Sequence, residues 1–100
     1  MAELTVIYWR DIPAQVIVRS GRRTAKRELA PRFQEAIDRA AMVGGARETD
    51  AYLAEWRRAA PEPCGDDLER AAQEAADRLE AAYDAARLAA LAKAGGRDVA

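Results

Sequence analysis

The fold is decided by the stretch Leu4-Thr-Val-Ile-Tyr-Trp-Arg10 and the run Gln15-Val-Ile-Val-Arg19 that follows it. Both runs are rich in β-branched and aromatic residues, which favour strands. Between them, Pro13 lacks a backbone N–H and holds Ile12 extended, so we expect a β-hairpin whose turn spans 11–14. Alternation along the first strand leaves both faces largely apolar, and the hairpin therefore needs cover on two sides.

A helix is predicted over 31–43. Pro31 suits the first helical position, and Gly44-Gly45 suits the end of a helix. The segment 22–30 before it fits either a short third strand or a helical lead-in. Within the predicted helix, apolar residues recur at the spacing of one buried helical face. They are Phe33, Ala36, Ile37, Ala40 and Ala41.

Two further helices are expected in the second half of the chain. Thr49 can cap a short helix that ends before 61–65, with Tyr52, Leu53, Trp56 and Ala60 on one face. Asp66 and Glu69 resemble a capping box that opens a third helix. That helix would run to about residue 94, before Gly95-Gly96, and would be on the order of 40 Å long.

The inward positions of this third helix alternate in steps of four and three, the spacing of a coiled-coil seam. Most of them are alanine, so the seam predicts close but weak packing and is compatible with an antiparallel homodimer. The positions are Leu68, Ala72, Ala75, Leu79, Ala82, Ala86 and Ala89.

These elements predict an α+β fold in which an N-terminal hairpin, with or without a third short strand, packs on about three helices, the last of them long. The length of 100 residues allows one hydrophobic core. We expect one domain over 1–94 and a flexible tail over 95–100.

Composition excludes much familiar chemistry. With no histidine and one cysteine, the chain offers no Ser-His-Asp or Cys-His pair, no imidazole base and no ordinary zinc site. Its carboxylates follow no metal-binding pattern and its glycine pairs lack a phosphate-loop context. We expect no catalytic residues, no metal and no cofactor.

Membrane insertion and export are not expected. No apolar run approaches the 18 or so residues of a membrane span, and the opening Met-Ala-Glu-Leu lacks the basic region of a signal peptide. The single cysteine agrees with a reducing compartment. The sequence therefore predicts a cytoplasmic protein.

A basic segment over 19–32 is the main candidate binding surface. Six cations within fourteen residues create a local positive field that an acidic protein surface or a nucleic acid would sense, although such a cluster is also typical of a solvated face. Trp9, next to Arg10 at the end of an apolar strand, is the preferred exposed anchor. The predicted partner-binding residues are Trp9, Arg10, Arg19, Arg22, Arg23, Lys26 and Arg27.

Three functions stay open on the residues alone. The first is an accessory protein that binds a protein partner, and the alternative is a module that binds nucleic acid through 19–32. The overall pI near 5.5 and the lack of a nucleic-acid motif argue against the nucleic-acid alternative. The third is a small enzyme component that uses Cys64. A helix N-terminus after Cys64 would lower the pKa of its thiol, whereas Asp66 and Asp67 would oppose that change.

Three stretches of the chain resemble a small bacterial "virulence factor" domain family: residues 4–13, residues 32–42, and Glu55-Trp-Arg57. The resemblance extends over about 3–92. Similar domains stand alone or end the larger conserved virulence factor C proteins. Stand-alone members are associated with genes of folate- and corrinoid-linked methyl transfer, so the resemblance implies an accessory role to a methyl-transfer enzyme or in virulence-related regulation. It supplies no catalytic residues.

Overall fold

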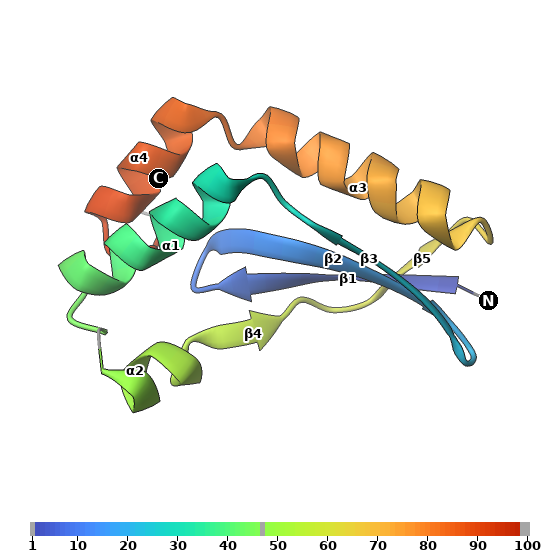
Figure 1. The fold of residues 1–100 in the computed structure, drawn as a ribbon, viewed down its shortest axis with the longest axis horizontal. Helices are drawn as coiled ribbons and strands as arrows, with labels where there is room; N and C mark the ends of the chain where they lie inside the picture. Colours follow the sequence, from blue (N-terminus) through green and yellow to red (C-terminus); the bar gives the residue numbers. More distant parts are fainter. Residues whose placement is uncertain (1, 47, 99–100) are drawn as a thin grey trace.

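A computed structural model describes residues 2–46 and 48–98 of the chain. Its sheet is antiparallel and five-stranded, and it places β3 at one edge, followed by β2, β1 and β4, with β5 also paired to β1 (Figure 1). The strands are β1 (Ala2–Trp9), β2 (Ile12–Ser20), β3 (Arg23–Glu28), β4 (Trp56–Arg58) and β5 (Glu62–Cys64). The α+β class is confirmed.

The predicted hairpin is present, but its turn is tighter than expected. Only Arg10 and Asp11 separate β1 from β2, and Arg10 has a φ of +52°. The expectation of a turn over 11–14 is wrong because the register shifts between Ile7 and Tyr8, which places Pro13 opposite Tyr8 inside β2. Such an irregularity is where a strand accepts a proline.

The segment that the sequence left open is a strand. Its residues 23–28 form β3, which pairs with β2 along its whole length. Its free edge carries Arg23, Lys26 and Arg27, and charged side chains are a common protection of an exposed sheet edge.

The helix α1 (Pro31–Val43) has the predicted bounds, with Pro31 at its start and Gly44 after its end. Its buried residues are the five predicted ones, Phe33, Ala36, Ile37, Ala40 and Ala41.

The second predicted helix is shorter than expected. α2 (Thr49–Ala54) begins after Glu48, and Thr49 lies inside it and not at its cap. Trp56 belongs to β4, where it pairs with Trp9, and Leu53 is 58% exposed. The predicted shared face is wrong because pairing with β1 extends the chain directly after Glu55.

The long third helix is also wrong. It is two helices, α3 (Leu68–Ala82) and α4 (Ala85–Lys93), separated at Tyr83 and Asp84. Asp67 and not Asp66 caps α3, accepting from the Arg70 N–H, and Asp84 caps α4, accepting from the Arg87 N–H.

The alanine seam ends with the break between these helices. Ala72 and Ala75 are buried against the sheet, whereas Ala82, Ala86 and Ala89 are exposed. In α4 the buried residues are Leu88, Leu91 and Ala92. A continuous seam for a coiled-coil dimer is therefore not present.

The core has two parts. α3 covers one face of the sheet, on which Leu4, Val16 and Val18 pack against Leu68 and Ala72. The end of the β1–β2 hairpin forms the second part, together with α1, α2 and α4, which surround it (Figure 1). Trp9, Ile12, Phe33 and Ile37 are the largest side chains there.

The part of the expected tail that the structure describes is held against the hairpin. Gly95 and Gly96 are buried, and the Gly96 carbonyl accepts from the Asp11 N–H at 2.8 Å. The Asp98 N–H donates to Asp11 Oδ2 at 2.7 Å. Residues 99 and 100, the rest of that tail, lie outside the described residues. Among the helices described, none has the length and apolar character needed to cross a bilayer.

Candidate functional site

Trp9 is not the exposed anchor that the sequence suggested. Its side chain is fully buried, and its Nε1–H donates to the Tyr52 carbonyl at 2.9 Å. Its ring lies 5.6 Å from that of Tyr52, centroid to centroid, with Gly96 against its edge. Trp9 does lie at the end of a strand, as predicted, but helices α1, α2 and α4 enclose that end.

Arg10 has a structural role in the same place. Its side chain is only 12% exposed, lies 4.9 Å from the Trp9 ring centroid and donates through Nη1 to the Gly95 carbonyl at 2.7 Å. Its Nε lies 3.3 Å from Glu55 Oε2. The guanidinium therefore joins the hairpin, the end of α2 and the C-terminal segment, and we leave it out of the binding surface.

The remaining predicted cations gather around the β2–β3 hairpin. Arg27 is paired with Glu69 and Gln73 of α3, and Arg32 donates to the Glu80 carbonyl. The other four side chains are exposed and make no ion pair or hydrogen bond with any residue that the structure describes. We call this group the cationic hairpin: Arg19, Arg22, Arg23 and Lys26.

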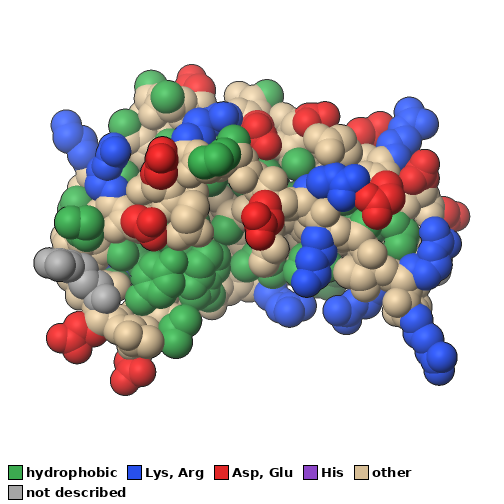
Figure 2. Space-filling model, in the orientation of Figure 1, with side chains coloured by type: hydrophobic (Ala, Val, Ile, Leu, Met, Phe, Trp, Pro, Cys, Tyr) green, Lys and Arg blue, Asp and Glu red, His purple; other side chains and the backbone are tan. Residues whose placement is uncertain are grey.

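Lysine and arginine side chains project around this hairpin at the end of the molecule away from α1 and α4 (Figure 2). By register, Arg19 lies opposite Thr24, and Lys26 lies opposite Ile17, on the sheet face away from α3. Arg22 lies in the turn itself. Arg22 and Arg23 thus lie at the hairpin tip, and Arg19 and Lys26 extend the charge onto the face of the sheet that α3 leaves uncovered.

Cys64 lies in β5 opposite Ala2 and contacts the core beneath α3. Burial raises the pKa of its thiol, and the nearby carboxylates of Asp66 and Glu3 raise that pKa further. A raised pKa leaves less thiolate at neutral pH, and the thiolate is the nucleophile. The geometry therefore favours an unreactive structural cysteine.

Four carboxylates of the second half serve the helices. Asp67 and Asp84 are caps, Glu74 pairs with Arg70 one turn before it, and Glu80 lies 3.9 Å from Arg32. Asp67 and Asp84 thus hold helix termini, Glu74 forms a pair within α3, and Glu80 joins α3 to α1.

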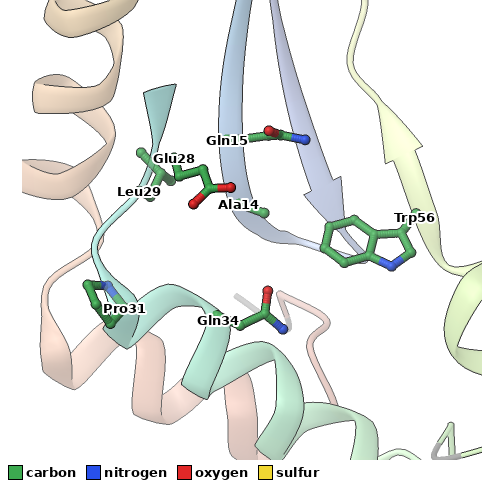
Figure 3. Close-up of a pocket in the computed structure, with 7 residues that line it drawn as sticks. All are labelled: Ala14, Gln15, Glu28, Leu29, Pro31, Gln34 and Trp56. Atoms are coloured by element: carbon green, nitrogen blue, oxygen red, sulfur yellow. The ribbon is translucent and has the colours of Figure 1, made fainter. Parts of the chain in front are cut away.

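The sequence did not predict a hollow between the sheet and α1, with a volume of about 270 Å³. Figure 3 shows Glu28 and Gln15 from the sheet, Gln34 from α1 and the Trp56 ring from β4 around one space. The side chains of Glu28 and Gln15 make no hydrogen bond or ion pair with any described residue. The complete lining is Ala14, Gln15, Glu28, Leu29, Pro31, Gln34 and Trp56.

A second hollow lies beside the first, along α1. It is lined by Asp38, Ala41, Met42 and Tyr52 and also measures about 270 Å³. Gln34 joins the two hollows because its Nε2 donates to Asp38 Oδ1 at 2.9 Å and to the Tyr52 hydroxyl at 3.3 Å.

We call the two hollows together the acidic groove. Its carboxylates are Glu28 and Asp38, its aromatic rings are Tyr52 and Trp56, and no described lysine or arginine lines it. The rings of Tyr52 and Trp56 contact edge to face, with centroids 5.9 Å apart. Exposed hydrophobic side chains lie at this end of the molecule, near α2 (Figure 2).

One signal in the sequence points to the groove. Gln34, Asp38 and Met42 follow one another at four-residue steps, and all three are exposed on α1. The sheet and β4 residues that complete the groove come from distant parts of the chain, and only the tertiary fold brings them together.

The chain was also compared with known proteins. Residues 7–92 match the model of the family described as "Virulence factor". No curated protein and no solved structure matches the chain. Because the match covers most of the sequence, from β1 to α4, the chain belongs to the Virulence factor family.

Proposed function

We propose that this protein is a non-catalytic accessory protein that binds a cytosolic protein partner through the cationic hairpin. One observation carries the proposal: Arg19, Arg22, Arg23 and Lys26 are exposed together and are not neutralised by any described residue. Clustered charge on a projecting element speeds encounter with an opposite surface and fixes its orientation. The partner surface is therefore acidic.

A methyl-transfer enzyme is the partner class that the family resemblance suggests, and virulence-related regulation is the setting that its name suggests. The hairpin suits an accessory role because its two strands belong to the sheet, which holds the charges in a fixed arrangement. The raised pKa of Cys64 supports a function without a thiol nucleophile.

Charge reversal in the turn tests the proposal. Arg22→Glu combined with Arg23→Glu should weaken binding of the partner by at least about tenfold, since close charge pairs at interfaces contribute more than 1.4 kcal/mol. The partner would be identified by affinity capture from the native cell and mass spectrometry, and binding measured with both purified proteins. Circular dichroism should be unchanged.

The matched control reverses two exposed cations elsewhere, Arg39→Glu in α1 and Arg78→Glu in α3. If both double variants weaken binding equally, the effect is one of net charge and the hairpin is not the contact. Unchanged affinity of the turn variant would contradict the proposal.

Nucleic acid is the second candidate, because the same four cations would contact phosphates. It predicts binding to DNA or RNA at ~50 mM salt that weakens steeply as salt rises. Binding of this kind, lost in the turn variant and kept in the control, would replace the protein partner with a nucleic acid.

A further inference from the structure

We infer that the acidic groove is a second binding site, opposite in sign to the cationic hairpin, and that it takes an arginine or lysine side chain from an extended protein segment that also presents an apolar residue. The inference rests on the groove alone and does not require the proposed role of the hairpin.

The first hollow has the groups that recognise a cation. The Glu28 carboxylate and the Gln15 amide line the same hollow as the half-buried Trp56 ring, and neither has a partner among the described residues (Figure 3). A guanidinium donates to carboxylate and amide oxygens in one plane and stacks on an indole face. The Glu28 carboxylate would instead repel an anionic ligand.

The second hollow has apolar groups for a neighbouring side chain. Met42 is 61% exposed, and Tyr52 closes the hollow from α2. Methionine is flexible and polarisable, so it adapts to different apolar partners. Asp38 lies between Met42 and Gln34, so negative charge extends along the whole groove.

The spacing of the hollows limits the ligand. Gln34 and Met42 are eight residues apart on α1, which corresponds to about 12 Å along the helix axis. An extended segment rises roughly 3.3 Å per residue and turns alternate side chains to the same face, so residues i and i+4 match this distance. We therefore expect the cation and the apolar residue of the ligand to be four positions apart.

A second copy of the chain is a less suitable occupant. Its Arg22 and Arg23 have the right charge, but a groove-to-hairpin contact joins two different surfaces and continues from copy to copy into open assemblies, unless the rotation closes a ring. We therefore assign the groove to a different protein, and self-association is one outcome of the test.

The test uses two capped pentapeptides, Arg-Ser-Thr-Ser-Leu and the same peptide with citrulline in place of arginine. Citrulline keeps the shape of arginine and removes its charge. Each is titrated into the ¹⁵N-labelled protein, and the Trp56 indole N–H peak is followed in two-dimensional NMR spectra. We expect the arginine peptide to shift this peak and to bind at least about tenfold more tightly, a difference of 1.4 kcal/mol.

Two variants locate the site. Glu28→Gln with Asp38→Asn should abolish the preference for the arginine peptide, while the NMR spectrum stays that of a folded protein. Asp66→Asn, in a different hollow before α3, should keep the preference. Equal binding of both peptides, shifts that map outside the groove, or no shift at millimolar peptide would each overturn the inference.

Light scattering provides the remaining comparison. A mass that rises with concentration and returns to about 11 kDa after Arg22→Glu and Arg23→Glu would assign the groove to a second copy and also overturn the inference. Failure of the hairpin proposal leaves the peptide titration unaffected, because the peptides are neutral or cationic and are measured without the natural partner.

Discussion

Gly96 occupies a position that no other residue fits without strain. Its φ is +89°, and a Cβ placed there would lie 2.9 Å from Cζ3 of the buried Trp9 ring. We predict that Gly96→Ala lowers the free energy of unfolding by about 3 kcal/mol, from left-handed backbone strain together with overpacking. Denaturant unfolding followed by circular dichroism measures this loss.

Gly45 provides the matched control. Its φ is +74°, but nothing lies within 4 Å of a Cβ placed there. Gly45→Ala should therefore lower the free energy of unfolding by only about 1 kcal/mol, from backbone strain alone. Equal losses in the two variants would show that contact with Trp9 does not add to the effect.

The two tryptophans show where residue-level reasoning fails. Both lie in strands, where successive side chains point to opposite faces of the sheet. This alternation is the same whether or not a helix covers a face, so it does not predict exposure. Trp9 is buried because distant helices enclose its end of the hairpin, whereas Trp56 stays half-buried beside an open hollow. Exposure of a large aromatic residue is therefore a tertiary property, and the local sequence predicted it wrongly.

At the scale of elements, prediction succeeded where both ends of a helix carry a signal. The bounds of α1 follow from Pro31, Gly44 and a strict apolar period. The break between α3 and α4 lacks glycine and proline, and alanine-rich sequence on both sides continues the helical pattern. Strand β4 was missed because three residues are too few to show a period.

The caps at these helices give a prediction. The Asp84 carboxylate accepts from the Arg87 N–H at 2.8 Å and so satisfies a free donor at the start of α4. Asp84→Ala should lower the free energy of unfolding by about 1 kcal/mol, and Asp67→Ala at α3 should have a similar effect. Thermal or denaturant unfolding measures both.

Asp66→Ala is the control, because the Asp66 side chain does not cap α3. Its effect should stay within about 0.5 kcal/mol, the usual range for a surface substitution. A larger loss for Asp66→Ala than for Asp67→Ala would mean that the capping box first expected at 66–69 forms in solution.

At the scale of the molecule, the two candidate surfaces lie toward opposite ends of a fold that measures 40 × 28 × 23 Å. The basic segment over 19–32 predicted the cationic hairpin, because its charges lie close together in the sequence. The acidic groove could not be predicted in this way. Its lining comes from β2, β3, α1, α2 and β4, and every element except α1 contributes only one or two residues.

The C-terminal segment closes the end of the molecule that carries the groove. The Gly96 carbonyl accepts a hydrogen bond from the hairpin turn, and the Gly95 carbonyl accepts one from the Arg10 side chain. The Arg97 guanidinium lies 3.3 Å from the Glu55 carboxylate. Residues 95–98 therefore hold the hairpin and α2 together. Removing residues 96–100 should lower the free energy of unfolding by about 3 kcal/mol, since the Asp11–Gly96, Gly96–Leu91 and Asp98–Asp11 hydrogen bonds are lost and each contributes about 1 kcal/mol. It should also uncover the Trp9 ring.

A Trp56→Phe background leaves Trp9 as the only tryptophan, so its fluorescence reports this exposure directly. In the shortened chain the emission should move to longer wavelength and become sensitive to iodide, because water then reaches the indole. A chain that lacks only residues 99 and 100 keeps the contacts of Gly96 and Arg97 and serves as the length control. Unchanged emission and stability after removal of 96–100 would show that the segment does not stabilise the hairpin. Helices α1, α2 and α4 alone would then exclude water from the Trp9 ring.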